Sequence, residues 1–295
     1  MVSYTSITIV YNPKSTGPGA KLSKELKDTL AALLPSVPVT RVKTARPGHA
    51  EEIAYAAAGQ TKHPLIISVS GDGGYHEVIN GLMKAQNEGA SPTAGLLPGG
   101  NANDHYRALH AGDIVARIKK GDERRIDLLK VSATVNGKPF VRYGHSYIGL
   151  GLTPKAGREL NKTKLNFIKE LGIVIRSIVR LAPVHIIVRG KKQAYDSLIF
   201  SNIDSMSKVM TLSKHAKIND GKFEVTAFHR RNTLVLLRQL LRASTTGLRG
   251  MTHRAEFTFT STAPLLVQVD GEIITLDAHT HVKITSESQV LRCIV

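Results

Sequence analysis

Three polar, glycine-rich turns each follow a short apolar run near the start of the chain, and this arrangement restricts the possible folds strongly. The apolar runs cover residues 7–11, 64–70 and 96–97, and a helical pattern follows each turn. Strands that alternate with helices at this spacing are typical of a mostly parallel sheet with helices on both faces. In such a sheet the turns after the strands lie together at the carboxyl edge, where ligands bind.

The pattern changes after Asp127. The dipeptide Asn136-Gly137, a strong hairpin signal, separates strand patterns at 130–135 and 138–143. More short strand patterns follow, interrupted by helical patterns near 165–181 and 233–242. We therefore predict an antiparallel, β-rich second half. A chain of 295 residues fits about two domains, which we expect to pack closely with a cleft between them.

The chain is basic, with 40 Lys and Arg against 23 Asp and Glu and a formal net charge of +17. This charge predicts an anionic partner: nucleic acid, a phosphorylated ligand or an acidic bilayer, the alternative being a basic solvated surface. Trp is absent and aromatic residues make up 5%, so a base-stacking platform is poorly supplied. Because no nucleic-acid motif is present either, we expect no nucleic-acid partner.

Targeting signals are not evident in the sequence. Residues 1–10 lack a basic segment and a long apolar run, so they resemble a first strand and not a signal peptide. The apolar stretch 165–181 contains four charged residues, which excludes a membrane-spanning helix there. The single Cys293 excludes an intramolecular disulfide and a cysteine-based zinc site. We expect a cytoplasmic protein.

The three turns offer backbone N–H groups and helix N-termini, both of which attract phosphate. No Walker loop occurs, but three such turns on one sheet edge favour a nucleotide ligand. Asp72 lies between Gly71 and Gly73, where its carboxylate could reach a magnesium ion or cap the next helix. Glu77 falls near the first turn of that helix, where a carboxylate favours the helix dipole.

Five segments together resemble one family, and they occur in that family's order. The turn at 71–74 resembles the Gly-Asp-Gly-Thr signature of the diacylglycerol kinase catalytic-domain family, which includes sphingosine, ceramide and bacterial lipid kinases. Residues 97–104 are similar to its Pro-x-Gly-Thr-x-Asn-Asp signature, and residues 12–15 to its opening Asn-Pro-x-Ser. Residues 216–223 resemble a metal-binding turn, and 269–272 resemble the late Asp-Gly-Glu.

The resemblance implies an α/β fold with an NAD-kinase-like nucleotide-binding domain over residues 1–127. A β-sandwich domain over 128–280 would follow, residues 281–295 would return to the first domain, and the active site would lie in the interdomain cleft. By motif position, the implied ATP contacts are Asn12, Pro13, Lys14, Ser15, Thr16, Thr44, Ser70, Gly71, Asp72, Gly73, Gly74, Tyr75, His76 and Asn101.

The same resemblance assigns the acidic positions. Asp72, Asp104 and Asp127 would organise the catalytic Mg²⁺ through water. Asp220, with the carbonyls of Lys217 and Lys222, would hold a structural Mg²⁺. Asp270 or Glu272 would be the base that takes the lipid hydroxyl proton, the alternative for this pair being an ordinary acidic turn.

Three positions depart from the family pattern. Gly74 stands where the family has Thr, which removes a hydroxyl near the phosphates, and Asn101 also replaces a Thr. Thr16 replaces the usual Gly, although Gly17 follows at once. Losing one hydrogen bond to a charged phosphate costs about 1.5–3 kcal/mol, enough to slow an enzyme without silencing it.

The leading interpretation is an ATP-dependent kinase that phosphorylates a membrane lipid alcohol, with diacylglycerol giving phosphatidate. The alternatives are a sphingoid base or polyprenol as substrate, or a non-catalytic protein that binds lipid or nucleotide. The segment 225–255 contains six arginines and neither Asp nor Glu. We expect it to dock the protein reversibly on anionic membranes, with core packing as the alternative. A homodimer is left open.

Overall fold

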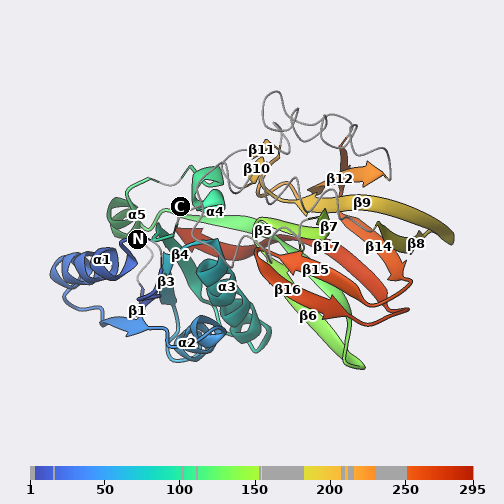
Figure 1. The fold of residues 1–295 in the computed structure, drawn as a ribbon. Helices are drawn as coiled ribbons and strands as arrows, with labels where there is room; N and C mark the ends of the chain where they lie inside the picture. The colour runs from blue at the N-terminus through green and yellow to red at the C-terminus, as the bar shows by residue number, and fades with distance from the viewer. Residues whose placement is uncertain are drawn as a thin grey trace. The chain divides into compact units, whose positions relative to one another are not determined.

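The computed structural model describes residues 4–15, 17–100, 103–110, 112–152, 154, 183–206, 210–211, 216–229 and 251–294 (Figure 1). Thr16, Asn101, both helices expected at 165–181 and 233–242, and most of the basic segment 225–255 lie outside these ranges. The chain divides into two compact units. Unit 1 comprises Met1–Asp127 with Gln289–Val295, and unit 2 comprises Leu128–Ser288, so residues 281–288 belong to unit 2.

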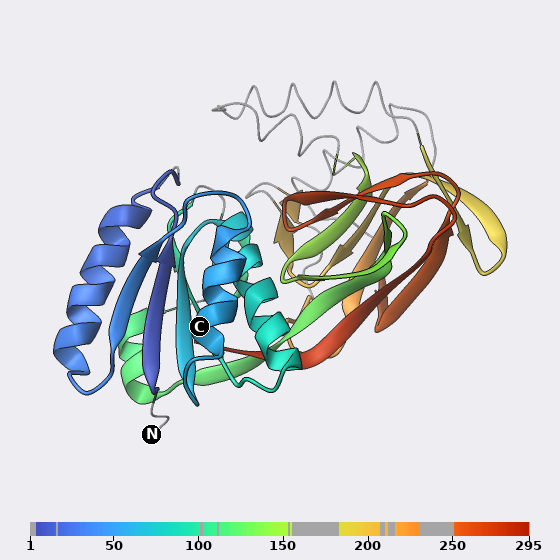
Figure 2. The ribbon, with the colours of Figure 1, turned by 90° about the horizontal axis from the view of Figure 1, so that it is seen from below.

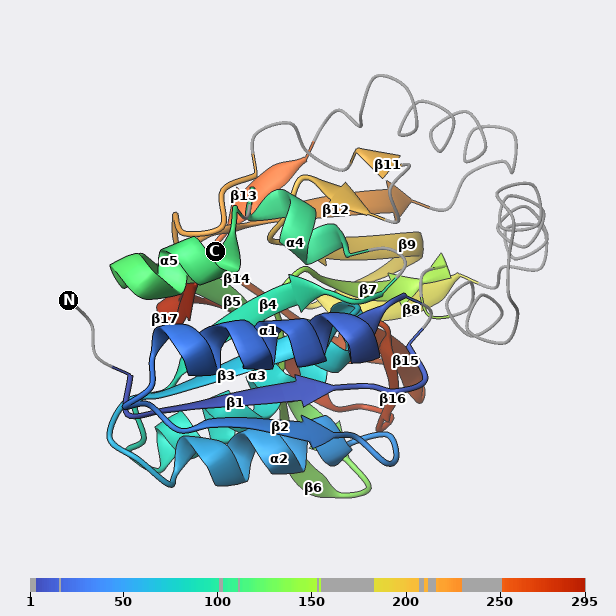
Figure 3. The same ribbon diagram turned by 90° about the vertical axis from the view of Figure 1, so that its left-hand side faces the viewer.

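The sheet of unit 1 is parallel, with strand order β2-β1-β3-β4 and the end of β17 beside β4. The strands are β1 (Ser6–Tyr11), β2 (Val39–Lys43), β3 (Pro64–Ser70), β4 (Thr93–Pro98) and β17 (His281–Ile294). Figure 3 shows β1 to β4 side by side. The expected parallel sheet is confirmed, and its carboxyl edge carries the loops that follow β1, β2, β3 and β4.

Helices cover both faces of this sheet (Figure 2). They are α1 (Gly19–Leu33), α2 (His49–Ala58), α3 (Asp72–Asn87), α4 (Asp104–Ala108) and α5 (Ile114–Lys120). Leu26 and Leu30 of α1 share one apolar cluster with Ile114 and Ile118 of α5. On the other face α2 packs against α3, and both contact β3.

The alternation of side chains along β3 decides what each face receives. Leu65, Ile67 and Val69 belong to the apolar cluster of α1 and α5. Because successive strand residues point to opposite faces, Ser68 and Ser70 point to the side of α2 and α3. The strand is buried along its whole length, and the two serine hydroxyls lie 2.7 Å apart, within hydrogen-bond distance of each other.

Unit 2 begins with the predicted hairpin, which is confirmed. Strands β5 (Glu123–Val135) and β6 (Lys138–Gly144) pair antiparallel around the turn. Asn136 and Gly137 both have positive φ, 51° and 72°, as the tight turn between twisted strands requires. The Asp277 carboxylate accepts hydrogen bonds from both backbone N–H groups, at 2.9 and 2.8 Å.

The remaining strands of unit 2 pair antiparallel in the order β16-β15-β7-β9-β8-β14-β17, with β12 beside β9 and β13 beside β12. Ile148, Phe200, Val225, Phe259 and Val282 come from five strands and belong to one buried cluster. The strands therefore enclose one apolar core. Their bounds are β7 (Tyr147–Gly151), β8 (Val184–Val188), β9 (Lys191–Ser201), β12 (Phe223–His229), β13 (Thr252–Arg254), β14 (Glu256–Ser261), β15 (Leu265–Val269) and β16 (Glu272–Leu276), with the short pair β10 (Ser205–Met206) and β11 (Met210–Thr211) forming a separate sheet.

A helix that crosses a bilayer must be both long and apolar. Among the helices within the described ranges, none meets both requirements.

Candidate functional site

A cavity of about 410 Å³ opens at the carboxyl edge of the parallel sheet in unit 1. Its wall includes Tyr11 at the end of β1, Thr44 after β2 and Ser70 at the end of β3. The volume lies within the usual range for small-molecule sites, about 300–1,000 Å³. The sheet edge that the glycine-rich turns predict as a ligand site is therefore hollowed.

Part of the predicted ATP-binding set lines this cavity. The residues in its wall are Asn12, Lys14, Thr44, Ser70, Gly73 and Gly74. The structure describes the other predicted contacts on the loop after β1 and at the start of α3, outside this wall: Pro13, Ser15, Gly71, Asp72, Tyr75 and His76. The loop after β1 is held by Asn12, whose side-chain oxygen accepts a hydrogen bond from the Lys14 N–H at 2.8 Å.

The sequence did not identify two further residues of the cavity wall, Ser68 and Arg46, as site residues. Ser68 lies inside the wholly buried strand β3, and only the direction of its side chain takes it to the cavity. Arg46 lies in the loop after β2, and its guanidinium pairs with the Glu52 carboxylate at 2.8 Å. Arg46 follows a predicted strand, and this position could have identified it as a site residue, because every loop on this edge borders the same site.

Glu77 also lines the cavity, and its role differs from the expected one. The sequence predicts a carboxylate that favours the dipole of its own helix, α3. Its oxygens instead accept hydrogen bonds from the Gly48 N–H at 2.9 Å and the Ala50 N–H at 3.1 Å, at the start of α2. Glu77 therefore caps the neighbouring helix and fixes the loop that carries Arg46. No local signal predicts this contact, since it depends on how α2 packs on α3.

Glycines allow the loops of this edge to touch each other. A Cβ on Gly100 would lie 2.4 Å from the Cα of Gly71, and one on Gly17 would lie 2.6 Å from the carbonyl oxygen of Gly99. Any side chain at these positions would push the loops apart. The three turns therefore form one continuous backbone surface, which suits close approach to a phosphate group.

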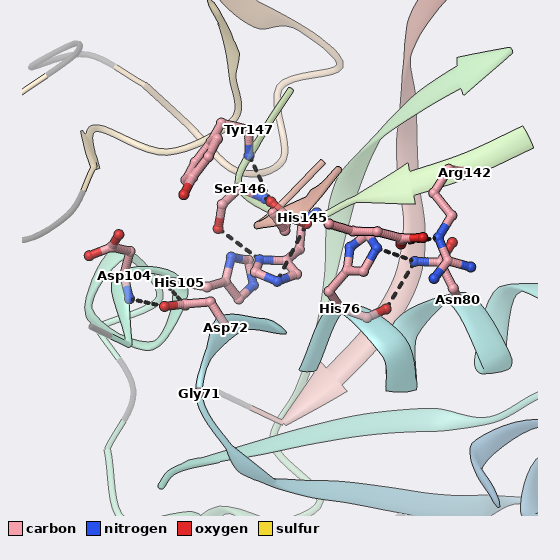
Figure 4. A network of polar contacts seen from close by, with 12 residues as sticks. Gly71, Asp72, His76, Asn80, Asp104, His105, Arg142, His145, Ser146 and Tyr147 are labelled. Atoms are coloured by element: carbon pink, nitrogen blue, oxygen red, sulfur yellow. Dashed lines mark hydrogen bonds and ion pairs between the residues drawn. The ribbon is translucent and has the colours of Figure 1, made fainter. Parts of the chain in front are cut away.

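Asp72 connects the turn after β3 to the turn after β4 (Figure 4). Its carboxylate accepts hydrogen bonds from the Asp104 N–H and the His105 N–H, each at 3.1 Å. Asp72 thus caps α4, whereas the sequence offered its own helix, α3, as the capping alternative. The buried Asp104 carboxylate is paired with Arg107. Asp72 therefore contacts the backbone of Asp104, whereas the Asp104 carboxylate contacts Arg107.

The third aspartate of that set, Asp127, lies on β5 and is fully buried. Its carboxylate accepts a hydrogen bond from the Gln289 N–H at 2.6 Å, and Gln289 begins the part of β17 that belongs to unit 1. The returning chain end thus orients this carboxylate.

In the same unit, burial raises the pKa of Tyr75 well above its ordinary value, so its hydroxyl stays neutral.

Unit 2 holds the two candidates for the catalytic base, Asp270 and Glu272, and these two acids differ in their surroundings. Asp270 is buried, and its carboxylate accepts hydrogen bonds from the N–H groups of His145, Ser146 and Tyr147 at 2.6, 3.0 and 2.9 Å. The Glu272 side chain is 39% exposed and accepts a hydrogen bond from Arg142 Nε at 2.7 Å. Asp270 therefore holds the start of β7 in place, while Glu272 keeps contact with solvent.

The predicted structural metal turn at 216–222 is a tight, exposed loop. The Asp220 carboxylate accepts a hydrogen bond from the Lys222 N–H at 3.0 Å, and Gly221 has a φ of 73°. A carboxylate and the carbonyls of Lys217 and Lys222 are hard oxygen donors, the kind that Mg²⁺ prefers, so the donor set fits this ion. Within the described ranges, no group of three or more His, Cys, Asp and Glu side chains forms a metal site.

Another acid of unit 2, Glu224, has an unusual environment. It is 3% exposed, and burial together with the charge of Asp220 raises its pKa from 4.5 to about 7. One of its oxygens lies 3.4 Å from His253 Nδ1. Glu224 escaped the sequence analysis, because a single glutamate in a strand carries no signal of burial.

Known proteins resemble this chain in sequence. The model of the family described as "Diacylglycerol kinase catalytic domain" matches residues 6–131. The diacylglycerol kinase of Bacillus subtilis (strain 168) is 29% identical over 262 residues, which is 82% of this chain and 78% of the relative. The diacylglycerol kinase of Staphylococcus saprophyticus is 34% identical over 131 residues, which is 42% of this chain and 41% of the relative.

Solved structures share the fold. A putative diacylglycerol kinase from Bacillus anthracis str. Sterne superposes with a TM-score of 0.73 at 19% identity, covering 100% of this chain and 98% of that chain. Yeast NADH kinase complexed with NADH superposes with a TM-score of 0.58 at 9% identity, covering 100% of this chain and 84% of that chain. These likenesses confirm the predicted fold class, a parallel α/β sheet combined with an antiparallel β region.

Proposed function

Because residues 6–131 belong to the diacylglycerol kinase catalytic-domain family, we propose that this protein is an ATP-dependent lipid kinase. It transfers the γ-phosphoryl group of ATP to the hydroxyl of a membrane lipid alcohol, with diacylglycerol as substrate and phosphatidate as product. The observation that carries the proposal is the cavity at the carboxyl edge of unit 1. Its wall comes from the turn with the opening Asn-Pro-x-Ser, the loop after β2 and the Gly-Asp-Gly turn after β3.

Phosphoryl transfer depends mainly on positioning and on neutralising charge. The cavity wall supplies both kinds of group: Lys14 and Arg46 carry positive charge, and the turn at Gly73 and Gly74 exposes backbone at the start of α3. Asp72, Asp104 and Asp127 would hold Mg²⁺ through water. Bound there, Mg²⁺ would neutralise negative charge on the phosphate groups.

The base belongs to unit 2 in this proposal. Asp270 or Glu272 takes the proton of the lipid hydroxyl as the oxygen attacks the γ-phosphorus, and the product nucleotide is ADP. Three backbone N–H groups fix the position of the Asp270 carboxylate. The partly exposed Glu272, oriented by Arg142, is the second candidate, and substitution separates the two.

The competing candidates differ in substrate or in chemistry. A sphingoid base or a polyprenol would use the same groups on another alcohol. A non-catalytic protein that binds lipid or nucleotide is favoured by one observation, the absence of a hydroxyl side chain at Gly74. We favour a cytoplasmic protein that docks reversibly on anionic lipid, because the formal charge is +17.

Purified protein incubated with radiolabelled ATP, Mg²⁺ and vesicles that contain single lipid alcohols tests the function. We expect label in phosphatidate when diacylglycerol is present. Label in a sphingoid base or polyprenol instead would change the substrate and keep the reaction. If no lipid in the panel is labelled while ATP still binds, the protein is a non-catalytic binding protein.

A further inference from the structure

Ser70 occupies the space that a side chain at position 74 would need. A Cβ on Gly74 would lie 2.5 Å from the Ser70 Oγ and 2.7 Å from the Ser70 Cβ. Real Cβ atoms do not approach other atoms so closely, and the Ser70 Cβ belongs to a buried strand that cannot shift freely. A serine at 70 therefore requires a glycine at 74 in this fold.

The displaced side chain would itself have carried a hydroxyl. Gly74 stands where the Gly-Asp-Gly-Thr signature has Thr, and Ser70 immediately precedes that signature. Both Ser70 and Gly74 line the cavity in unit 1. The first turn of α3 lacks this hydroxyl, but the end of β3 supplies one 2.5 Å from the point where a Cβ of residue 74 would lie.

The hydrogen bonds of Ser70 leave its hydroxyl able to turn toward a ligand. Its Oγ lies 2.7 Å from the Ser68 Oγ, and its O–H donates to the Gly71 carbonyl oxygen at 3.0 Å. A serine hydroxyl has one proton and two lone pairs. When the Ser68 O–H donates to the Ser70 Oγ, the Ser70 hydroxyl can rotate. Its O–H then donates to a phosphate oxygen in place of the Gly71 carbonyl oxygen.

We propose that the Ser70 hydroxyl is the phosphate-binding hydroxyl of this cavity and replaces the one absent at Gly74. The assignment rests on the proposed function, since it takes ATP as the ligand. Under this assignment, the glycine at position 74 does not mean that a phosphate contact is lost. The hydroxyl that makes the contact has moved from position 74 to position 70.

The test is a set of five variants: S70G, S70A, G74T, S70G/G74T and S70A/G74T. The dissociation constant for ATP with Mg²⁺ is measured by calorimetry, KM for ATP in the lipid assay, and the melting temperature of each protein by thermal unfolding. We expect S70G and S70A to weaken ATP binding by about tenfold or more, as loss of a hydrogen bond to a charged group does. G74T alone lowers both ATP affinity and melting temperature, because its Cβ meets Ser70.

The double variants show whether a hydroxyl at position 74 can replace the one at position 70, or whether the single substitutions only disturb the structure. S70G/G74T should recover ATP affinity to within about threefold of the wild type, with its melting temperature rising above that of G74T. S70A/G74T is the matched control, and it should not recover, because the methyl group of the introduced alanine keeps the 2.7 Å contact.

Two outcomes overturn the assignment while the proposed function stands: S70G and S70A binding ATP as the wild type does, or S70G/G74T binding no better than G74T. A wild-type protein that binds no nucleotide overturns the assignment and the proposed function together.

Discussion

The backbone N–H of Asp104 donates a hydrogen bond to the Asp72 carboxylate at 3.1 Å, and this bond joins the turn after β3 to the turn after β4. One carboxylate thus orders both signature turns of the proposed kinase. The same group is proposed to organise Mg²⁺, so its charge and its hydrogen bonds contribute separately. A substitution that keeps the shape and removes the charge distinguishes them.

We predict that Asp72→Asn lowers turnover by about 100-fold or more, the range for a group that stabilises transition-state charge. Its amide oxygen still accepts one hydrogen bond from the start of α4, so the melting temperature should fall less than in Asp72→Ala. Turnover and thermal unfolding of both variants check this. Wild-type turnover in Asp72→Asn would remove Asp72 from the proposed magnesium network.

Glu77→Gln should loosen the loop between β2 and α2. The glutamine amide has no negative charge to interact with the helix dipole at the start of α2. It also accepts only one of the two hydrogen bonds from Gly48 and Ala50, because its NH₂ group is a donor. The free energy of unfolding should therefore fall by about 1 kcal/mol. Because the same loop borders the cavity, KM for ATP should rise more than kcat changes. Steady-state kinetics and denaturant unfolding measure the two effects.

Glu25→Gln is the matched control for Glu77. Glu25 lies on the exposed side of α1, 3.8 Å from Lys21, and such surface pairs contribute about 0–1 kcal/mol. Equal changes in the two variants would contradict a specific role for Glu77.

The two base candidates should respond differently to neutral substitution. Asp270→Asn places an amide N–H₂ group among three backbone N–H donors, so both stability and turnover should fall. Glu272→Gln should lower the melting temperature little, because its side chain is 39% exposed. Loss of a general base costs about 10²–10⁴-fold in turnover with ATP affinity retained. A doubly substituted protein with wild-type turnover would rule out both residues.

Stability should fall as pH rises from about 4.5 through 7 on account of Glu224. The folded protein keeps the proton of this carboxyl up to a pKa of about 7, while the unfolded chain releases it near 4.5, so the folded state binds more protons in this window. Asp220 strengthens this effect, and His253, 3.4 Å away, opposes it when protonated.

Denaturant unfolding of the wild type and Glu224→Gln between pH 4 and 8 measures this contribution. The free energy of unfolding of Glu224→Gln minus that of the wild type should increase as the pH rises. Glu256→Gln, which removes an exposed strand glutamate paired with Lys283, is the matched control and should not show this gain. A constant difference for Glu224→Gln as well would show that Glu224 titrates normally.

Membrane docking through the basic segment is testable by co-sedimentation with liposomes. We predict binding that rises with anionic lipid content and falls with salt, since each Lys or Arg near the surface contributes about 1 kcal/mol. Replacing Arg231, Arg238 and Arg242 by Glu should abolish it. Binding that ignores charge, salt and this triple substitution would exclude the segment from docking and leave the kinase proposal untouched.

Short-range patterns in the sequence predicted most elements of residues 1–127 and the hairpin that follows them. The alternating strands and helices of residues 1–127 and the Asn136-Gly137 hairpin depend on periodicity and turn geometry within a few residues. The place of the site followed from the same information, because loops after parallel strands must share one edge. Motif residues such as Asn12 and Ser70 line the cavity there.

Contacts across the fold were decided only by the tertiary structure. Glu77 binds the start of α2, Asp127 binds Gln289 from the far end of the chain, and each pairing depends on how whole elements pack. The sequence shows Gly74 as the loss of a hydroxyl, whereas the structure puts the Ser70 hydroxyl 2.5 Å from the missing Cβ. Spacing along a chain predicts which side chains exist near a turn, but the space each can occupy is set by neighbours that packing brings together.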